Sequence, residues 1–172
     1  MIKKNASFSS SNAHTSQSYY TNTGTIITTF DSQAWRDATE LSWARTILHE
    51  SIHAYLASQF AISRPNWMAT YPQMVAKWGR LQNWNDVHHE EIARSIVSDI
   101  STSLQEYGNS RGYNFSSQFY DDLAWGGLQN TRTFQNFTQR EKTRILNTIA
   151  IELTGMDTQG NSKIQKGINA GC

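Results

Sequence analysis

His49, Glu50 and His53 form an HExxH motif, His-Glu-Ser-Ile-His, within a stretch of helix-forming residues. On an α-helix, side chains four residues apart lie on the same face one turn apart, so both imidazoles can reach one ion. HExxH on a helix is a zinc-hydrolase signature in which the glutamate acts as general base. We therefore expect His49 and His53 to bind Zn²⁺ and Glu50 to be catalytic. The alternative is a metal-free pair of histidines at the edge of a buried helix face.

A catalytic zinc site has three protein ligands and one position for water, so the sequence must supply a third ligand. Residues 54–85 contain no Asp, Glu, His or Cys, and the first candidates then come together within residues 86–91. They open an amphipathic stretch with apolar residues at helical spacing. His89 lies near the centre of the apolar face and Glu90 at its margin. We predict His89 as the third ligand, with Glu90 as the second choice.

Such a site would hydrolyse an amide bond. Bound zinc lowers the pKa of water from 15.7 to about 7 and polarises a carbonyl. Glu50 would take the proton from the attacking water and pass it to the departing amine. Groups that could stabilise the negative oxygen of the transition state are Arg111, Tyr113, Tyr120 and His88.

Spacing excludes two neighbouring kinds of zinc site. The extended HExxHxxGxxH motif would need Gly at position 56 and His at position 59, where this chain has Leu56 and Gln59. A thermolysin-like site would need a helical Glu soon after the motif, and the acid-free stretch excludes it. A His-His-His or His-His-Glu site closed by a second helix remains.

The composition indicates one globular domain. The chain has 172 residues, of which 38% are hydrophobic and 12% aromatic, enough for one packed core. A net charge of +1 gives no argument for binding nucleic acid. Cys172 is the only cysteine, which excludes an internal disulfide and a thiolate metal cluster. We expect neither a membrane span nor a signal peptide.

The order of predicted elements indicates a mainly helical α+β fold. We expect a flexible Ser/Thr/Asn-rich lead-in over residues 1–24, a single domain over 25–155 and a loose tail over 156–172. A strand at residues 25–30 would precede the motif helix, and it could pair with an extended substrate. Gly108 would follow the second long helix as its C′ residue, and Thr138 with Glu141 would form a capping box. The expected helices are 32–60 or 39–60, a short one at 72–78, then 86–107, a helical turn at 119–125, and 139–153.

Three segments resemble zincin metallopeptidases: Leu-His-Glu-Ser-Ile-His-Ala at 48–54, Asp-Val-His-His-Glu-Glu-Ile-Ala at 86–93, and Leu-Ala-Trp-Gly-Gly-Leu at 123–128. The likeness is to SprT-like domains and to metallopeptidase modules of bacterial polymorphic toxins. It implies a zincin-like domain with a small sheet before the HExxH helix, zinc on His49, His53 and His89, and Glu50 as base. Ile92 departs from the Met expected in such relatives, and no chemistry attaches to the third segment.

The resemblance also implies a biological setting. The domain would be the toxin or effector part of a larger bacterial protein, delivered out of the cell with it, with a protein or peptide substrate and a cognate immunity or inhibitor protein as partners. Two other functions stay open. One is a non-catalytic, zinc-stabilised interaction module, and the other is a SprT-like DNA-associated protease.

Overall fold

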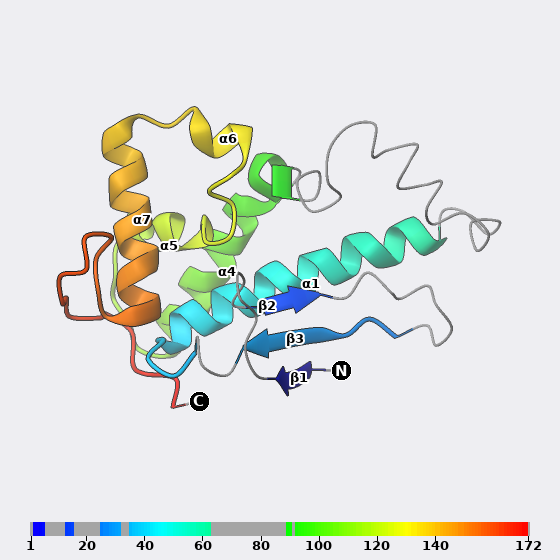
Figure 1. Cartoon of the computed structure of the whole chain (residues 1–172), viewed down its shortest axis with the longest axis horizontal. Coiled ribbons are helices and arrows are strands. Elements are labelled where there is room, and N and C mark those ends of the chain that lie inside the picture. The colour runs from blue at the N-terminus through cyan, green and yellow to red at the C-terminus, as the bar shows by residue number, and fades with distance from the viewer. Residues whose placement is uncertain are drawn as a thin grey trace.

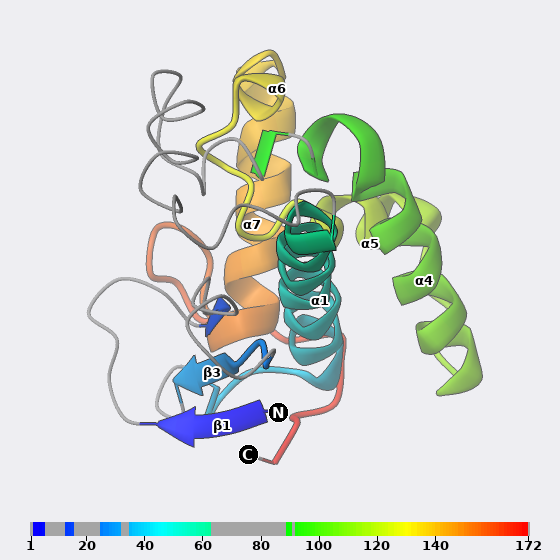
Figure 2. The ribbon, with the colours of Figure 1, turned by 90° about the vertical axis from the view of Figure 1, so that its right-hand side faces the viewer.

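The computed structural model describes residues 2–5, 13–15, 25–31, 35–62, 89–90 and 92–171. Its central element is the long helix α1 (Glu40–Ile62), which carries the HExxH motif (Figure 1). A small sheet lies on one side of α1, and the helices α4 (Val97–Ser110), α5 (Ser117–Ala124) and α7 (Gln139–Thr154) pack on its other sides (Figure 2). The predicted mainly helical α+β class is confirmed.

The sheet has three strands in the order β1-β3-β2. The central strand β3 (Thr28–Asp31) pairs in parallel with β1 (Ile2–Asn5) and antiparallel with β2 (Ala13–Thr15). A strand therefore precedes α1 as predicted, but it begins three residues later and ends one residue later than expected. The prediction that this strand pairs with a substrate is wrong, because β1 and β2 occupy both of its edges.

The predicted flexible lead-in over residues 1–24 is also corrected where the structure describes it. Two segments of it, β1 and β2, are strands of the sheet, and Thr15 is buried. A Ser/Thr/Asn-rich composition gives only a local signal. These strands form through pairing with β3, a long-range contact that the local composition does not reveal.

Helix α1 begins after Thr39, whose Oγ1 accepts a hydrogen bond from the Ser42 N–H at 3.2 Å, as an N-cap residue does. The later of the two predicted starts is therefore confirmed. Apolar clusters lie on two sides of α1, which holds the motif helix firmly in place. The cluster on the sheet side contains Phe30, Trp35, Ala38 and Trp43, and the cluster on the helical side contains Leu41, Ile92, Leu104, Tyr120, Leu123 and Ile145.

The described residues of the second predicted helix are helical, but one segment of it is a π-helix. Residues 89–90 are helical, η4 (Ile92–Ile96) is a π-helix, and α4 follows directly. Gly108 is not the C′ residue, because α4 continues to Ser110 and Gly112, at φ +83°, takes that position. A side chain at position 108 would overlap the ring of Tyr120, so glycine allows α4 and α5 to pack closely.

The C-terminal third contains both of its predicted helices, together with a short helix at Arg132–Gln135 that was not predicted, and its tail differs from the prediction. Helices α5 and α7 lie where we expected them, and α7 begins with the predicted Thr138–Glu141 capping box. Residues 156–171 are not loose: the Glu152 carboxylate accepts the backbone N–H groups of Lys166 and Gly167, and Ala170 N–H donates to the carbonyl of Ala38. The short helix predicted at 72–78 lies outside the described residues.

Candidate metal centre

Three histidines from two helical segments meet at one point. His49 and His53 lie one turn apart on α1, and His89 reaches them from the segment before η4. The Nε2 atom of His49 is 3.0 Å from Nε2 of His53 and 3.3 Å from Nε2 of His89. The three ring centroids are 4.8, 4.9 and 5.2 Å apart. This near-equilateral arrangement can hold one metal ion.

The distances from Nε2 of His49 to the other two Nε2 atoms, 3.0 and 3.3 Å, are close to those expected around tetrahedral zinc. Two nitrogens at Zn–N distances of about 2.05 Å in a tetrahedron lie about 3.3 Å from each other. A shared proton is a poorer explanation, because Nε2 of His49 has one in-plane lone pair and cannot satisfy both neighbouring nitrogens in a good geometry. A cation bound by the three lone pairs satisfies these Nε2 atoms, whereas Nδ1 of His49 is buried without a hydrogen-bond partner among the described residues.

Burial favours the neutral imidazoles that metal binding requires. His49 and His53 are both buried, and His89 is partly buried. Burial lowers the pKa of His49 well below its ordinary value, and the neighbouring His53, His89 and Arg45 act in the same direction. His49 therefore resists protonation, and its lone pair is available to a metal ion.

Glu50 lies beside the histidines and lines the same pocket as His49 and His89. Its carboxylate accepts a hydrogen bond from the hydroxyl of Thr15, which in turn lies 2.9 Å from the hydroxyl of Thr28. Burial raises the pKa of Glu50, and the Thr15 hydrogen bond opposes this rise. A raised pKa is suited to a general base that must take up a proton. Thr15 was not predicted as part of the site, because β2 was not predicted.

Glu90, the second choice for the third ligand, has a different role. Its carboxylate accepts hydrogen bonds from the backbone N–H groups of Arg132 and Thr133 and from the Thr133 hydroxyl. These groups open the short helix α6 (Arg132–Gln135), so Glu90 caps that helix. The structure brings His89, and not Glu90, to the motif histidines.

The Gly126–Gly127 turn after α5 packs directly against α1. A Cβ atom at position 127 would lie 3.0 Å from Cε1 and 3.3 Å from Nε2 of His49, and the φ of Gly127 is +87°. A Cβ atom at position 126 would overlap the guanidinium group of Arg45. No chemistry could be assigned to the Leu-Ala-Trp-Gly-Gly-Leu segment from the sequence. The structure shows that its two glycines pack against the candidate ligand His49 and against Arg45.

Of the groups expected to stabilise the transition state, the three that the structure describes do not line the pocket. Arg111 and Tyr113 bind the carboxylate of Glu40, nine residues before His49 and hence about 13 Å away along the helix axis. Tyr120 is fully buried against Gly108, and His88 lies outside the described residues.

Sequence reasoning missed Arg45, which does line the pocket. Its position four residues before His49, on the same helical face, was a signal that could have identified it.

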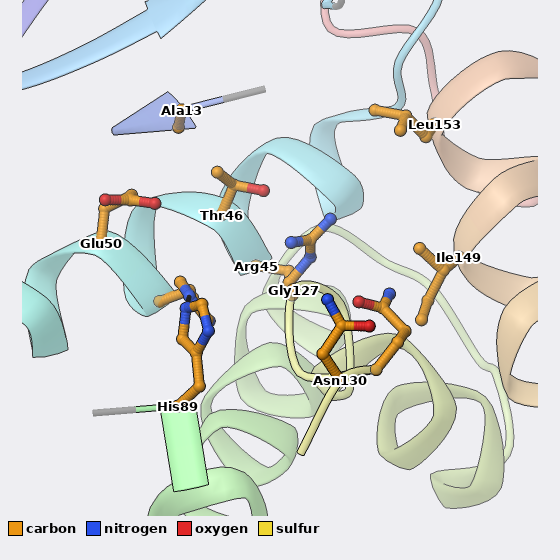
Figure 3. Close-up of a pocket in the computed structure, with 11 residues that line it drawn as sticks. Ala13, Arg45, Thr46, Glu50, His89, Gly127, Asn130, Ile149 and Leu153 are labelled. Atoms are coloured by element: carbon orange, nitrogen blue, oxygen red, sulfur yellow. Dashed lines mark hydrogen bonds between the residues drawn. The ribbon is translucent and has the colours of Figure 1, made fainter. Parts of the chain in front are cut away.

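The pocket has a volume of about 400 Å³ and is shown in Figure 3. His89 reaches up from below α1, Glu50 and Arg45 extend from α1, and Asn130 follows the Gly127 turn. Ile149 and Leu153 of α7 form the apolar side. The pocket therefore joins the histidine cluster, a carboxylate and a cation in one concave site, the usual form of a ligand-binding site.

Comparison of the chain with protein-family models, with curated proteins and with solved structures finds no match. The resemblance to zincin metallopeptidases therefore stays a prediction. Among the described helices, none is long and apolar enough to cross a membrane.

Proposed function

We propose that this protein is a zinc-dependent metallopeptidase with a zincin-like catalytic domain. The observation that carries the proposal is the convergence of the Nε2 atoms of His49, His53 and His89, with Glu50 on the wall of the same pocket. Three imidazoles from an HExxH helix and a second helix are a typical donor set for catalytic zinc.

Zinc is the metal that fits best. All three donors are imidazole nitrogens, and the N–N distances of 3.0 and 3.3 Å suit tetrahedral coordination. When bound, zinc would polarise the scissile carbonyl and make water more acidic.

The protein's own residues would then transfer the proton and bind the substrate. Glu50 takes the proton from the attacking water and returns it to the amine that leaves, while Thr15 holds one carboxylate oxygen in place. A carboxylate with a raised pKa accepts this proton more readily than an exposed one. Asn130 and Gln129, which line the pocket, can bind the backbone amides of an extended peptide.

The main alternative is a non-catalytic module in which the metal only joins two helical segments. A structural zinc site is closed by a fourth protein ligand. Within the described ranges, the cluster has three His ligands and adjoins a pocket, which favours a catalytic site over a closed one. The SprT-like DNA-associated role, the toxin role and the immunity protein stay predictions from the resemblance.

The decisive experiment compares Glu50→Gln with the wild type. Both should bind about one zinc per chain, because the substitution leaves the three histidines unchanged. Cleavage of unfolded casein should fall by about 10²- to 10⁴-fold in the variant, since the general base is lost. Products are identified by mass spectrometry, which distinguishes peptide hydrolysis from other chemistry. Glu106→Gln, an exposed change on α4, is the matched control and should retain full activity. Full casein cleavage by zinc-loaded Glu50→Gln would contradict the proposal.

A further inference from the structure

Arg45 is a buried cation beside the histidine cluster. It lies one helical turn before His49 on α1, and only 5% of its surface is exposed. It lines the same pocket as His49 and His89. In Figure 3 it lies between the His89 side of the pocket and the side formed by Ile149.

The guanidinium group of Arg45 has an N–H donor that no described residue satisfies. Its Nε atom is buried without a hydrogen-bond partner. Glu50, the acid that shares the pocket, attracts the guanidinium group electrostatically, but its carboxylate is hydrogen-bonded to Thr15. Burial lowers the pKa of Arg45 to about 10, so the guanidinium group stays charged at neutral pH. A buried guanidinium group with an unpaired N–H donor is unfavourable, and an anion that enters the pocket would relieve this cost.

The guanidinium group also packs against the polypeptide backbone on one side. The backbone of Gly126 lies against it so closely that any side chain at position 126 would overlap it. A guanidinium group offers paired N–H donors to a planar anion such as a carboxylate.

The other pocket residues indicate which anion fits. Among the described residues, Arg45 is the only Lys or Arg that lines the pocket, and Glu50 adds a negative charge there. One cation suits a singly charged carboxylate better than a doubly charged phosphate. Gln129 and Asn130 provide neutral amides, while Ile149 and Leu153 provide an apolar wall for a short aliphatic stem.

We propose that Arg45 binds a carboxylate of the substrate, so that the site selects peptides with a carboxylate close to the bond that is cleaved. The inference rests on the proposed peptidase function, for which it names the substrate class. The carboxylate is supplied either by the peptide C-terminus or by an Asp or Glu side chain, and both present the same group to Arg45.

The test is a binding measurement by calorimetry on the zinc-loaded Glu50→Gln protein, which holds peptides without cleaving them. One pair of probes is an acetylated, amidated alanine pentapeptide with Glu or Gln at its centre. The other pair is an acetylated alanine pentapeptide with a free or amidated C-terminus. In one pair the carboxylate form should bind about ten- to a hundredfold more tightly, as expected for charge-assisted hydrogen bonds. The pair that shows the preference identifies the source of the carboxylate.

Arg45→Met, added to the same protein, should abolish this preference while zinc content stays unchanged. Arg36→Met, which removes an exposed arginine with 72% of its side-chain surface accessible, is the matched control and should retain it. If Arg45→Met does not fold, Gly126→Ala serves instead, because it displaces the guanidinium group and should weaken the preference. Equal binding within both pairs, or a preference that survives these changes at Arg45 and Gly126, would overturn the inference.

The two proposals can fail separately. A clear carboxylate preference in a protein that does not cleave casein would refute the peptidase and leave the role of Arg45 intact. Casein cleavage without any preference would refute only the role of Arg45.

Discussion

The backbone of Gly127 lies against the imidazole of His49, so that a Cβ atom at position 127 would be 3.3 Å from Nε2, the candidate metal-binding atom. This contact joins the turn after α5 to the helix that carries the HExxH motif. It gives a physical reason for the second glycine of the Gly126–Gly127 pair. The residue must have a positive φ, and it must leave room for the His49 ring.

Gly127→Ala should therefore weaken zinc binding as well as stability. At φ +87°, an alanine costs about 1–2 kcal/mol, and its methyl group would push the His49 ring. Thermal unfolding and zinc titration measure the two effects. Gly160→Ala is the matched control, because Gly160 has φ +81° with nothing within 4 Å of its Cβ position. It should cost similar stability and leave zinc affinity unchanged. Equal zinc affinity in both variants would contradict the proposed contact.

The identity of the third ligand is tested by neighbouring substitutions. His89→Ala should abolish tight zinc binding, because two histidines alone hold the ion weakly. Glu90→Gln should bind zinc as the wild type does and lose about 1 kcal/mol of stability, since Glu90 caps α6. Zinc content after gel filtration distinguishes the two. Loss of zinc in Glu90→Gln with retention in His89→Ala would reverse the assignment.

The capping box of α7 predicts a pH dependence of stability. The Thr138 hydrogen bonds hold the pKa of Glu141 below its usual value of 4.5. A carboxylate with a lowered folded-state pKa stabilises the protein above its unfolded pKa, and this contribution is lost as the pH falls through the folded pKa. Wild type should therefore exceed Glu141→Gln in unfolding midpoint at pH 7, and the gap should shrink from pH 5 toward pH 3. A gap that is constant with pH would show that the charge of Glu141 contributes nothing.

Local features of the sequence predicted much of the site. The four-residue spacing of His49 and His53 depends only on helix geometry, and the Thr138–Glu141 capping box depends only on four consecutive residues. His89 was found because apolar residues around it repeat at helical spacing, which shows the side that faces inward.

What the sequence could not show depends on contacts between distant segments. β1 and β2 exist through pairing with β3, and Thr15 reaches Glu50 only after that pairing. The tail after α7 is ordered by Glu152, which accepts two of its backbone N–H groups, a contact without local signal. The burial of Arg45 likewise depends on the Gly126–Gly127 turn, which is about 80 residues away in the sequence.

The central claim is that His49, His53 and His89 together hold one divalent metal ion. The most direct test is zinc uptake by equilibrium dialysis of protein purified without chelator, compared with the three single His→Ala variants and with His14→Ala, an exposed histidine outside the cluster. We predict about one zinc per chain for the wild type and His14→Ala, and none at the same free zinc concentration for the other three. A wild type that takes up no metal, or cluster variants that bind it as well as the wild type does, would contradict the account.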